Sequence, residues 1–85
     1  MKGNFVEDIM SVYVDNLRNS KISVKWTYSK SCHLTADSDD ELLSFAVVLG
    51  LKRTWLQISK RKMVKHFDLC SSMRTKALSL GAIER

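Results

Sequence analysis

The sequence contains no proline, and its three glycines stand far apart along the chain. A phosphate-binding loop needs several glycines close together ahead of a helix, so this class of nucleotide site is excluded. The two cysteines, Cys32 and Cys70, are too few for a disulfide scaffold and form no CxxC pair, which argues against a structural zinc site. We therefore expect two free thiols that pack as small apolar side chains.

Long hydrophobic runs are also missing, and none approaches the roughly 20 residues that a helix needs to cross a bilayer. The first ten residues, MKGNFVEDIM, combine one lysine with two acids and have no long apolar core, unlike a secretory signal. A hydrophobic content of 45% without repeats or low-complexity segments is typical of a globular chain. These features predict a cytoplasmic protein that makes no contact with a membrane.

The length of 85 residues is that of one domain. The regular hydrophobic pattern begins only at Met10, so we predict an N-terminal extension over residues 1–9 and a single domain over residues 10–85. Residues 11–15 are rich in β-branched and aromatic residues and predict a short strand. Residues 22–28 alternate between apolar and polar and predict a half-buried strand, and residues 32–35 could form another short strand.

Residues 39–49 carry the clearest helix signal. Ser38 and Glu41 have the spacing of a capping box, and Gly50 stands where a left-handed residue ends a helix. The apolar residues within this segment follow one helical stripe: Leu42, Phe45, Ala46 and Leu49. Residues 51–57 favour a helical turn over a strand, and residues 58–65 are predicted to form an exposed loop.

A second helix is predicted to end before Gly81, with Asp68 or Ser71 as its cap. Met73, Ala77 and Leu80 would form its buried stripe, and the last four residues could add a terminal strand. Strands followed by helices predict a small α+β domain: a sheet of two to four strands with two main helices packed on one face.

The net charge is +5, and it is distributed unevenly. The acids Asp37, Asp39, Asp40 and Glu41 lie at the start of the first helix. No acid interrupts the basic residues of segment 52–65, which are Lys52, Arg53, Lys60, Arg61, Lys62 and Lys65. Such a run suits a polyanion, meaning nucleic acid, a nucleotide or an acidic protein face, although a solvated loop that keeps the protein soluble explains it equally well.

The stretch HFD, residues 66–68, has the strongest chemical signal. In an extended segment His66 and Asp68 point to the same side and Phe67 points into the core. A histidine beside a carboxylate can act as a general base or bind a metal. The alternative is that Asp68 caps the second helix and His66 lies on the surface, which leaves His66 unexplained.

The sequence indicates no cofactor, but it leaves open the binding of a divalent metal ion. His33, Asp37, His66 and Asp68 could together supply two imidazoles and two carboxylates, a donor set that suits such an ion. Their spacing matches neither a zinc finger nor an HExxH motif. A lone histidine such as His33 is more often structural.

Segment 52–57 could also hold a nucleotide. If it were extended, Arg53, Trp55 and Gln57 would share one face, where an aromatic ring can stack on a base and a cation can hold a phosphate. Arg74 could join this site from the second helix. The alternatives are that Trp55 belongs to the core and that Arg74 lies on a solvated helix face.

Three stretches, VYVDNLR, CHLTADSDDELLSFAVVLGLKRTWLQ and HFDLCSSMRTKALSLGAIE, resemble a small domain family of unknown function from bacteriophage and bacterial genomes. The resemblance covers about residues 10–84, with Phe67 where tyrosine is usual. It implies a phage origin and, because some bacterial relatives are joined to a predicted metal-dependent phosphohydrolase, nucleotide or nucleic-acid chemistry nearby. It also implies that the shared polar residues meet on one rim of the sheet: Asp15, His33, Asp37, Arg53, His66, Asp68 and Arg74.

Three functions remain open at this point. The favoured one is a small phage accessory protein that inhibits or modulates by binding nucleic acid or a host nucleic-acid-processing protein. Its binding residues would be Asp15, Asp37, Arg53, Trp55, Lys60, Arg61, Lys62 and Arg74. The alternative is a metal-dependent phosphoesterase or nuclease with His33, His66 and Asp68 as catalytic residues and Arg53 and Arg74 on phosphate oxygens. A structural or self-associating module is the third.

Overall fold

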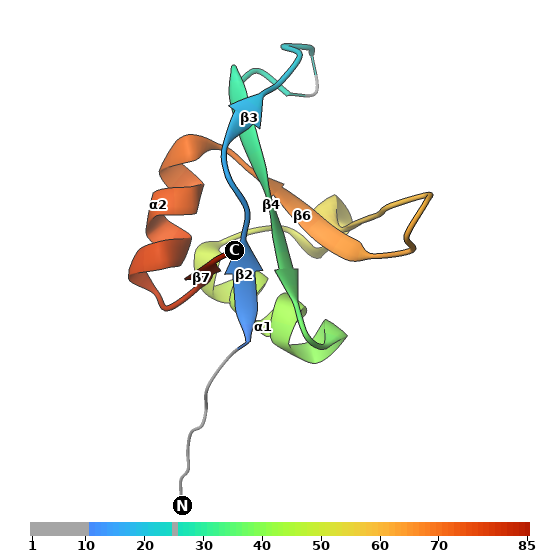
Figure 1. The fold of residues 1–85 in the computed structure, drawn as a ribbon, viewed down its shortest axis with the longest axis vertical. Helices are drawn as coiled ribbons and strands as arrows, with labels where there is room; N and C mark the ends of the chain where they lie inside the picture. Colours follow the sequence, from blue (N-terminus) through green and yellow to red (C-terminus); the bar gives the residue numbers. More distant parts are fainter. Residues whose placement is uncertain (1–10, 25) are drawn as a thin grey trace, which may run out of the picture.

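The computed structural model describes residues 11–24 and 26–85 (Figure 1). The elements in chain order are β2 (Val12–Val14), β3 (Arg18–Asn19), β4 (Lys30–Ala36), α1 (Asp39–Leu49), the 3₁₀ helix η1 (Arg53–Trp55), β5 (Gln57–Ile58), β6 (Lys65–Leu69), α2 (Ser71–Ser79) and β7 (Ile83–Glu84). Two main helices and a mixed sheet confirm the α+β class. The predicted extension over residues 1–9 lies outside the described residues. In the described part of the chain, neither helix is long and apolar enough to cross a membrane.

Strand β4 is the centre of the sheet, whose strands follow the order β5-β6-β4-β2-β7, while β3 pairs with one end of β4. β4 runs antiparallel to β2 and β6, and β7 lies parallel to β2. Within the described residues the sheet has six strands, more than the two to four that the sequence predicted. The strands β3, β5 and β7 are each two residues long, which is too short to leave an alternating pattern in the sequence.

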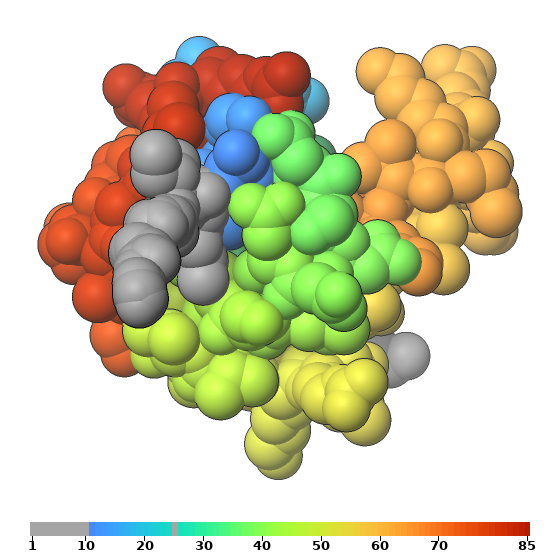
Figure 2. All heavy atoms as spheres, turned by 90° about the horizontal axis from the view of Figure 1, so that it is seen from below, coloured from blue at the N-terminus to red at the C-terminus, as the bar shows by residue number. Residues whose placement is uncertain are grey.

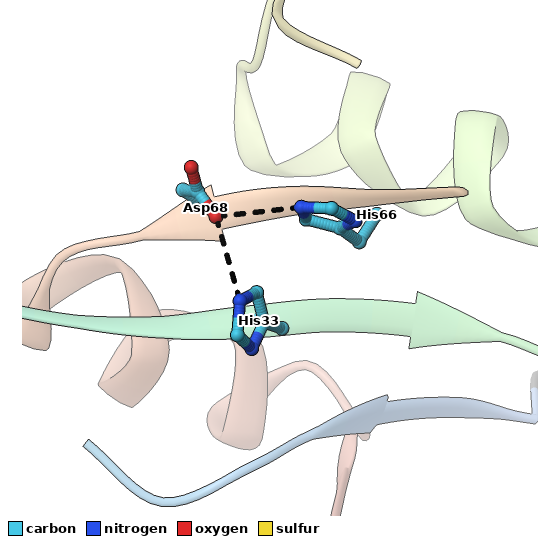
Figure 3. A group of neighbouring side chains, drawn as sticks. All are labelled: His33, His66 and Asp68. Atoms are coloured by element: carbon cyan, nitrogen blue, oxygen red, sulfur yellow. Dashed lines mark ion pairs between the residues drawn. The ribbon is translucent and has the colours of Figure 1, made fainter. Parts of the chain in front are cut away.

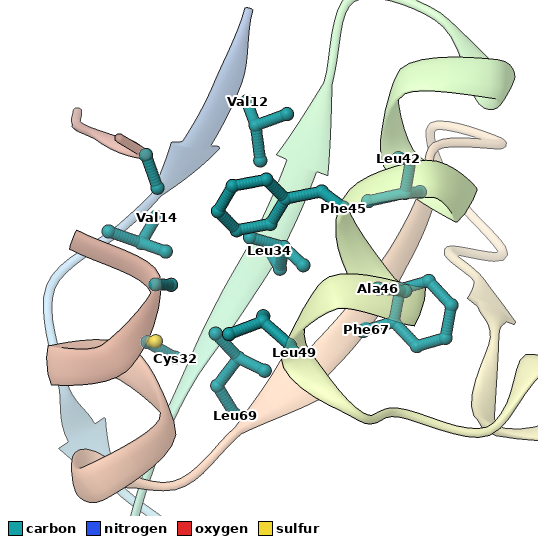
Figure 4. Packing of buried hydrophobic residues seen from close by; sticks show 12 residues of the cluster. Val12, Val14, Cys32, Leu34, Leu42, Phe45, Ala46, Leu49, Phe67 and Leu69 are labelled. Atoms are coloured by element: carbon teal, nitrogen blue, oxygen red, sulfur yellow. The ribbon is translucent and has the colours of Figure 1, made fainter. Parts of the chain in front are cut away.

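Both helices pack on the same face of the sheet, as predicted (Figure 4). Cys32 and Leu34 of β4 and Phe67 and Leu69 of β6 are at most 2% exposed and form one cluster with apolar side chains of α1. Burial raises the pKa of the Cys32 thiol to about 11, so this residue packs as an apolar side chain. The residues between them in each strand, His33 among them, point to the opposite, helix-free face.

Helix α1 has the bounds that its local sequence predicted. The Ser38 hydroxyl accepts a hydrogen bond from the backbone N–H of Glu41 at 3.2 Å and donates one to the Glu41 carboxylate at 2.9 Å. Gly50 ends the helix with a φ of 88°, a left-handed conformation that glycine adopts without steric cost. The capping interactions of Ser38 with Glu41 and the backbone conformation of Gly50 are local in the sequence.

Replacing Ser38 by alanine is expected to lower the free energy of unfolding by about 1 kcal/mol, because the backbone N–H of Glu41 loses its acceptor. Urea denaturation followed by circular dichroism would measure this loss. The matched control is Ser44→Ala, which makes the same change at an exposed position in the middle of α1 and should be neutral or slightly stabilising. Equal effects of the two substitutions would contradict a role for the cap.

Helix α2 begins after Cys70, which occupies the N-cap position without a side-chain cap hydrogen bond. The prediction that Asp68 or Ser71 caps this helix is therefore wrong, since Asp68 lies within β6 and Ser71 is the first helical residue. Ala77 is fully buried, as predicted. Leu80 is largely exposed because it follows the last helical turn, and Leu78 packs against the core in its place.

The predicted strand over residues 22–28 is also wrong. This segment is part of the connection between β3 and β4, where Ile22 and Val24 are exposed. Ser23 and Trp26 exchange backbone hydrogen bonds of 2.7 and 3.2 Å, which close a turn in the middle of the predicted strand. The segment alternates in sequence, but the described sheet offers it no neighbouring strand with which to pair.

Three predictions for the second half of the chain agree with the structure. Residues 53–55 form one turn of 3₁₀ helix, and Gln57–Ile58 and Lys65–Leu69 make a hairpin whose connection carries the exposed basic residues. This connection, drawn in orange, projects from the body of the molecule (Figure 2). The terminal strand is also present, as β7.

A candidate metal site on the helix-free face of the sheet

The sheet register brings three polar side chains together from two strands. His33 of β4 lies directly opposite Asp68 of β6 in the antiparallel pair. His66 precedes Asp68 by two residues in β6, so both side chains leave the same face of the strand, while Phe67 between them is buried. The alternation predicted for HFD is therefore present, and the cluster lies on the face that the helices leave open.

The three side chains point toward a common point (Figure 3). Asp68 Oδ1 lies 3.9 Å from His33 Nε2 and 3.7 Å from His66 Nε2. One ligand atom from each residue lies within 4.8 Å of the other two. Metal–ligand bonds to nitrogen and oxygen are about 2.1 Å long, so a small approach of each side chain would let all three atoms reach one ion.

Each member of the cluster has its other polar atom held by a neighbouring group. Asp15 Oδ2 lies 2.7 Å from His33 Nδ1, and the backbone carbonyl of Val64 lies 3.2 Å from His66 Nδ1. A carbonyl or an ionised carboxylate only accepts hydrogen bonds, so we infer that both Nδ1 atoms carry the proton. With the proton on Nδ1, the Nε2 atom of each ring is the one that faces the cluster and can act as a metal ligand.

Asp15 and Gln57 make further hydrogen bonds that orient His33 and Asp68. Gln57 Nε2 donates a 2.8 Å hydrogen bond to Asp68 Oδ2, which leaves Oδ1 for the cluster. Asp15 also accepts the backbone N–H of His33 through Oδ1 at 2.6 Å. Burial raises the pKa of the Asp15 carboxyl, but the hydrogen bonds from His33 and the favourable electrostatic interactions with His33 and Arg18 outweigh burial and hold that pKa below its usual value. Asp15 is thus an ionised acceptor at neutral pH.

A groove of about 690 Å³ opens beside the two imidazoles. His33, His66 and Asp15 line one part of it, and Lys60 and Lys62 of the β5–β6 connection line another. Arg18 lines it too, a contribution that the sequence analysis missed. Cationic side chains therefore stand beside the cluster. We define this cavity as the basic groove.

Several residues predicted to share the rim lie elsewhere. Asp37 accepts a hydrogen bond from the Tyr13 hydroxyl at 3.1 Å. Arg74 Nε donates to the backbone carbonyl of Asp15 at 2.9 Å and its guanidinium pairs with Glu84. Arg74 thus joins α2 to the ends of β2 and β7 and does not hold a phosphate beside the imidazoles.

The segment around η1 also differs from its predictions. Residues 53–55 are not extended, so Arg53, Trp55 and Gln57 do not share one strand face. Trp55 is 52% exposed and does not belong to the core. Arg61 is exposed in the basic connection, but it does not line the groove that Lys60 and Lys62 line.

The role of Gln57 could not be found from sequence spacing, because it depends on which strands pair. β5 and β6 place Gln57 opposite His66. Only the family resemblance points to Asp15, and the structure gives it a physical role, since its carboxylate contacts both the backbone N–H and the ring of His33.

Comparison with known proteins supports the resemblance seen in the sequence. The model of a family described as "Protein of unknown function (DUF4031)" matches residues 12–85, a range that includes every member of the His33–His66–Asp68 cluster. No curated protein and no solved structure matches the chain. The chain therefore belongs to the DUF4031 family of proteins of unknown function.

Proposed function

We propose that His33 Nε2, His66 Nε2 and Asp68 Oδ1 bind one divalent metal ion and that the protein is a metal-dependent phosphoesterase. The observation that carries this proposal is the convergence of three ligand atoms whose side chains are each oriented by a second hydrogen bond. Ligating histidines in proteins characteristically donate their other ring N–H to a carboxylate or carbonyl. Both histidines of the cluster have such a partner.

The donor set favours a transition metal. Two imidazoles and one carboxylate suit Zn²⁺, Mn²⁺ or Fe²⁺, whereas Mg²⁺ and Ca²⁺ prefer ligands that are all oxygen. Three protein ligands leave coordination positions for water and substrate, as in catalytic zinc sites. An ion bound there would polarise a phosphoryl oxygen and lower the pKa of a bound water.

The basic groove favours a phosphate ester over other substrates. Lys60, Lys62 and Arg18 line the same cavity as His33 and His66. Cations placed around a phosphoryl group stabilise the negative charge that spreads over its oxygens during transfer. The net charge of +5 also attracts polyanions to the protein as a whole.

Binding of nucleic acid without chemistry is the second candidate function. The exposed basic connection between β5 and β6 supports it, and the partner would be nucleic acid or a host nucleic-acid-processing protein. The two candidates differ in one respect. Only the phosphoesterase requires the convergence of His33, His66 and Asp68.

Metal titration of the chelator-treated protein tests the proposal. Isothermal titration calorimetry with Zn²⁺ and with Mn²⁺ should show one site per chain for at least one of them. Hydrolysis of bis(p-nitrophenyl) phosphate should then depend on that metal and stop on addition of EDTA. Absence of binding for both metals would contradict the metal site, and binding without hydrolysis of this diester or of a single-stranded oligonucleotide would favour the second candidate.

Replacing Asp15 by asparagine is expected to weaken metal binding by about 10- to 100-fold, the range for partners that orient a ligand. The asparagine oxygen can still accept the backbone N–H of His33, so the end of β4 keeps its contact. The amide NH₂ would instead donate to His33 Nδ1 and move the ring proton to Nε2, which blocks the ligand atom. Asp40→Asn, an exposed change at the start of α1, is the control and should leave the affinity unchanged.

A further inference from the structure

A second groove, of about 730 Å³, lies on the other side of Gln57. Aromatic side chains line it from two separate segments, Trp26 and Tyr28 from the β3–β4 connection and Trp55 from η1. Leu49, Leu51, Cys70 and Met73 supply further apolar lining. Its volume is that of a small-molecule site. We call it the aromatic groove.

Trp55 is presented to solvent in this groove. Its side chain is half exposed, and the ammonium of Lys52 lies 5.7 Å from its ring centroid. Trp26 packs edge-on against Tyr28 with ring centroids 5.2 Å apart, and its indole N–H donates to the Ser20 hydroxyl at 3.1 Å. The Trp26–Tyr28 pair is therefore held in place, while Trp55, with the Lys52 ammonium over its ring, presents half-exposed aromatic surface to the groove.

The aromatic groove adjoins the proposed metal ligands. Gln57 lines both grooves, and Asp68, whose carboxylate accepts a hydrogen bond from Gln57, is a lining residue of the aromatic groove. His33 and His66 line the basic groove, and both lie within 4 Å of that carboxylate. The two grooves therefore meet at Gln57, beside the cluster.

We infer that the aromatic groove binds an unpaired nucleobase and that the substrate is single-stranded nucleic acid, an inference that rests on the proposed phosphoesterase function. A base stacks on Trp55, the adjoining phosphate lies at the cluster, and the next phosphate lies against Lys60 and Lys62. A duplex is excluded, because the faces of its bases are covered by their neighbours. A mononucleotide would occupy the aromatic groove and the cluster but leave the basic groove without a role.

Fluorescence anisotropy tests this inference without any metal. A fluorescein-labelled oligothymidylate of about eight nucleotides, within the site sizes of single-strand binders, is titrated with the protein in EDTA at low salt. Trp55→Ala should weaken binding between about 5- and 150-fold, the range for loss of one base–aromatic stack. Trp55→Phe keeps an aromatic face and should restore most of the affinity. The exposed residue Val48 of α1 provides a control, Val48→Ala, which should bind like the unchanged protein.

Two results would overturn the inference. One is equal affinity of the unchanged protein and Trp55→Ala, with circular dichroism showing that both are folded. The other is binding of a duplex of the same length, or of thymidine monophosphate, as tight as that of the oligothymidylate. Because EDTA is present throughout, Trp55-dependent binding in a protein that fails the metal titration would support the base site and reject the metal site. Metal binding, combined with oligonucleotide binding that does not depend on Trp55, would support the metal site and reject the base site.

Discussion

Replacing His66 by alanine is expected to lower the affinity for the metal more than 100-fold and to abolish metal-dependent hydrolysis of phosphodiesters. Loss of an orienting partner alone costs about 10- to 100-fold, so loss of a ligand must cost more. His66 is on the helix-free face, and its Nδ1 atom contacts the backbone carbonyl of Val64, two residues away in the chain. The fold should therefore persist, and calorimetry with turnover of bis(p-nitrophenyl) phosphate would measure the effect.

Substitution of a second proposed metal ligand, Asp68, tests the same site independently. Asp68→Asn keeps an oxygen that can accept from Gln57 but removes the charge from the cluster, and it should weaken metal binding nearly as much as His66→Ala. Asp40→Asn makes the same chemical change at the start of α1 and should have no effect on affinity or turnover. Unchanged metal affinity in both His66→Ala and Asp68→Asn would exclude the site.

Replacing Phe67 by alanine is expected to destabilise the protein by about 3–5 kcal/mol. Phe67 is fully buried in the core cluster that it shares with apolar side chains of α1 (Figure 4), and its truncation removes buried contacts and leaves a cavity. A domain of 85 residues has a free energy of unfolding of about 4–13 kcal/mol in total. This one substitution therefore removes a large part of the stability or all of it.

Thermal denaturation would measure the loss of Phe67, with an expected fall in Tm on the order of 20 °C. Val48→Ala is the matched control, since it also truncates an apolar residue, but one that is 56% exposed on α1. Its effect should stay within about 0.5 kcal/mol. A Tm of Phe67→Ala within a few degrees of the unchanged protein would show that Phe67 is not part of a tightly packed core.

Helix α1 and the alternation in β6 could be predicted because their causes are local. The cap of α1 involves Ser38 and Glu41, three residues apart, and Gly50 ends the helix through its own backbone conformation. In β6, the period of two determines that Phe67 points away from His66 and Asp68. None of these features depends on a distant part of the chain.

The strand predicted over residues 22–28 failed for the opposite reason. Alternation is necessary for a half-buried strand, but a strand also needs a neighbour with free hydrogen-bonding groups. The edge of β4 pairs only with Arg18 and Asn19 in this region, and the chain then turns at Ser23 and Trp26. The apolar residues that alternate in this segment are therefore left largely on the surface. Trp26 and Tyr28 line one groove there together with Trp55 of η1.

The sequence by itself determined the class of the domain, the bounds of α1, the alternation in HFD and the exposed basic connection between β5 and β6. The reason is that periodicity, capping and charge act over a few residues. Only the tertiary structure decided that His33 meets His66 and Asp68, that Asp15 and Gln57 orient them, and that Arg74 and Asp37 lie apart from them. The physical reason is strand pairing. Contacts between residues tens of positions apart depend on which strands are neighbours and in which register, and that is settled by burial of the shared core.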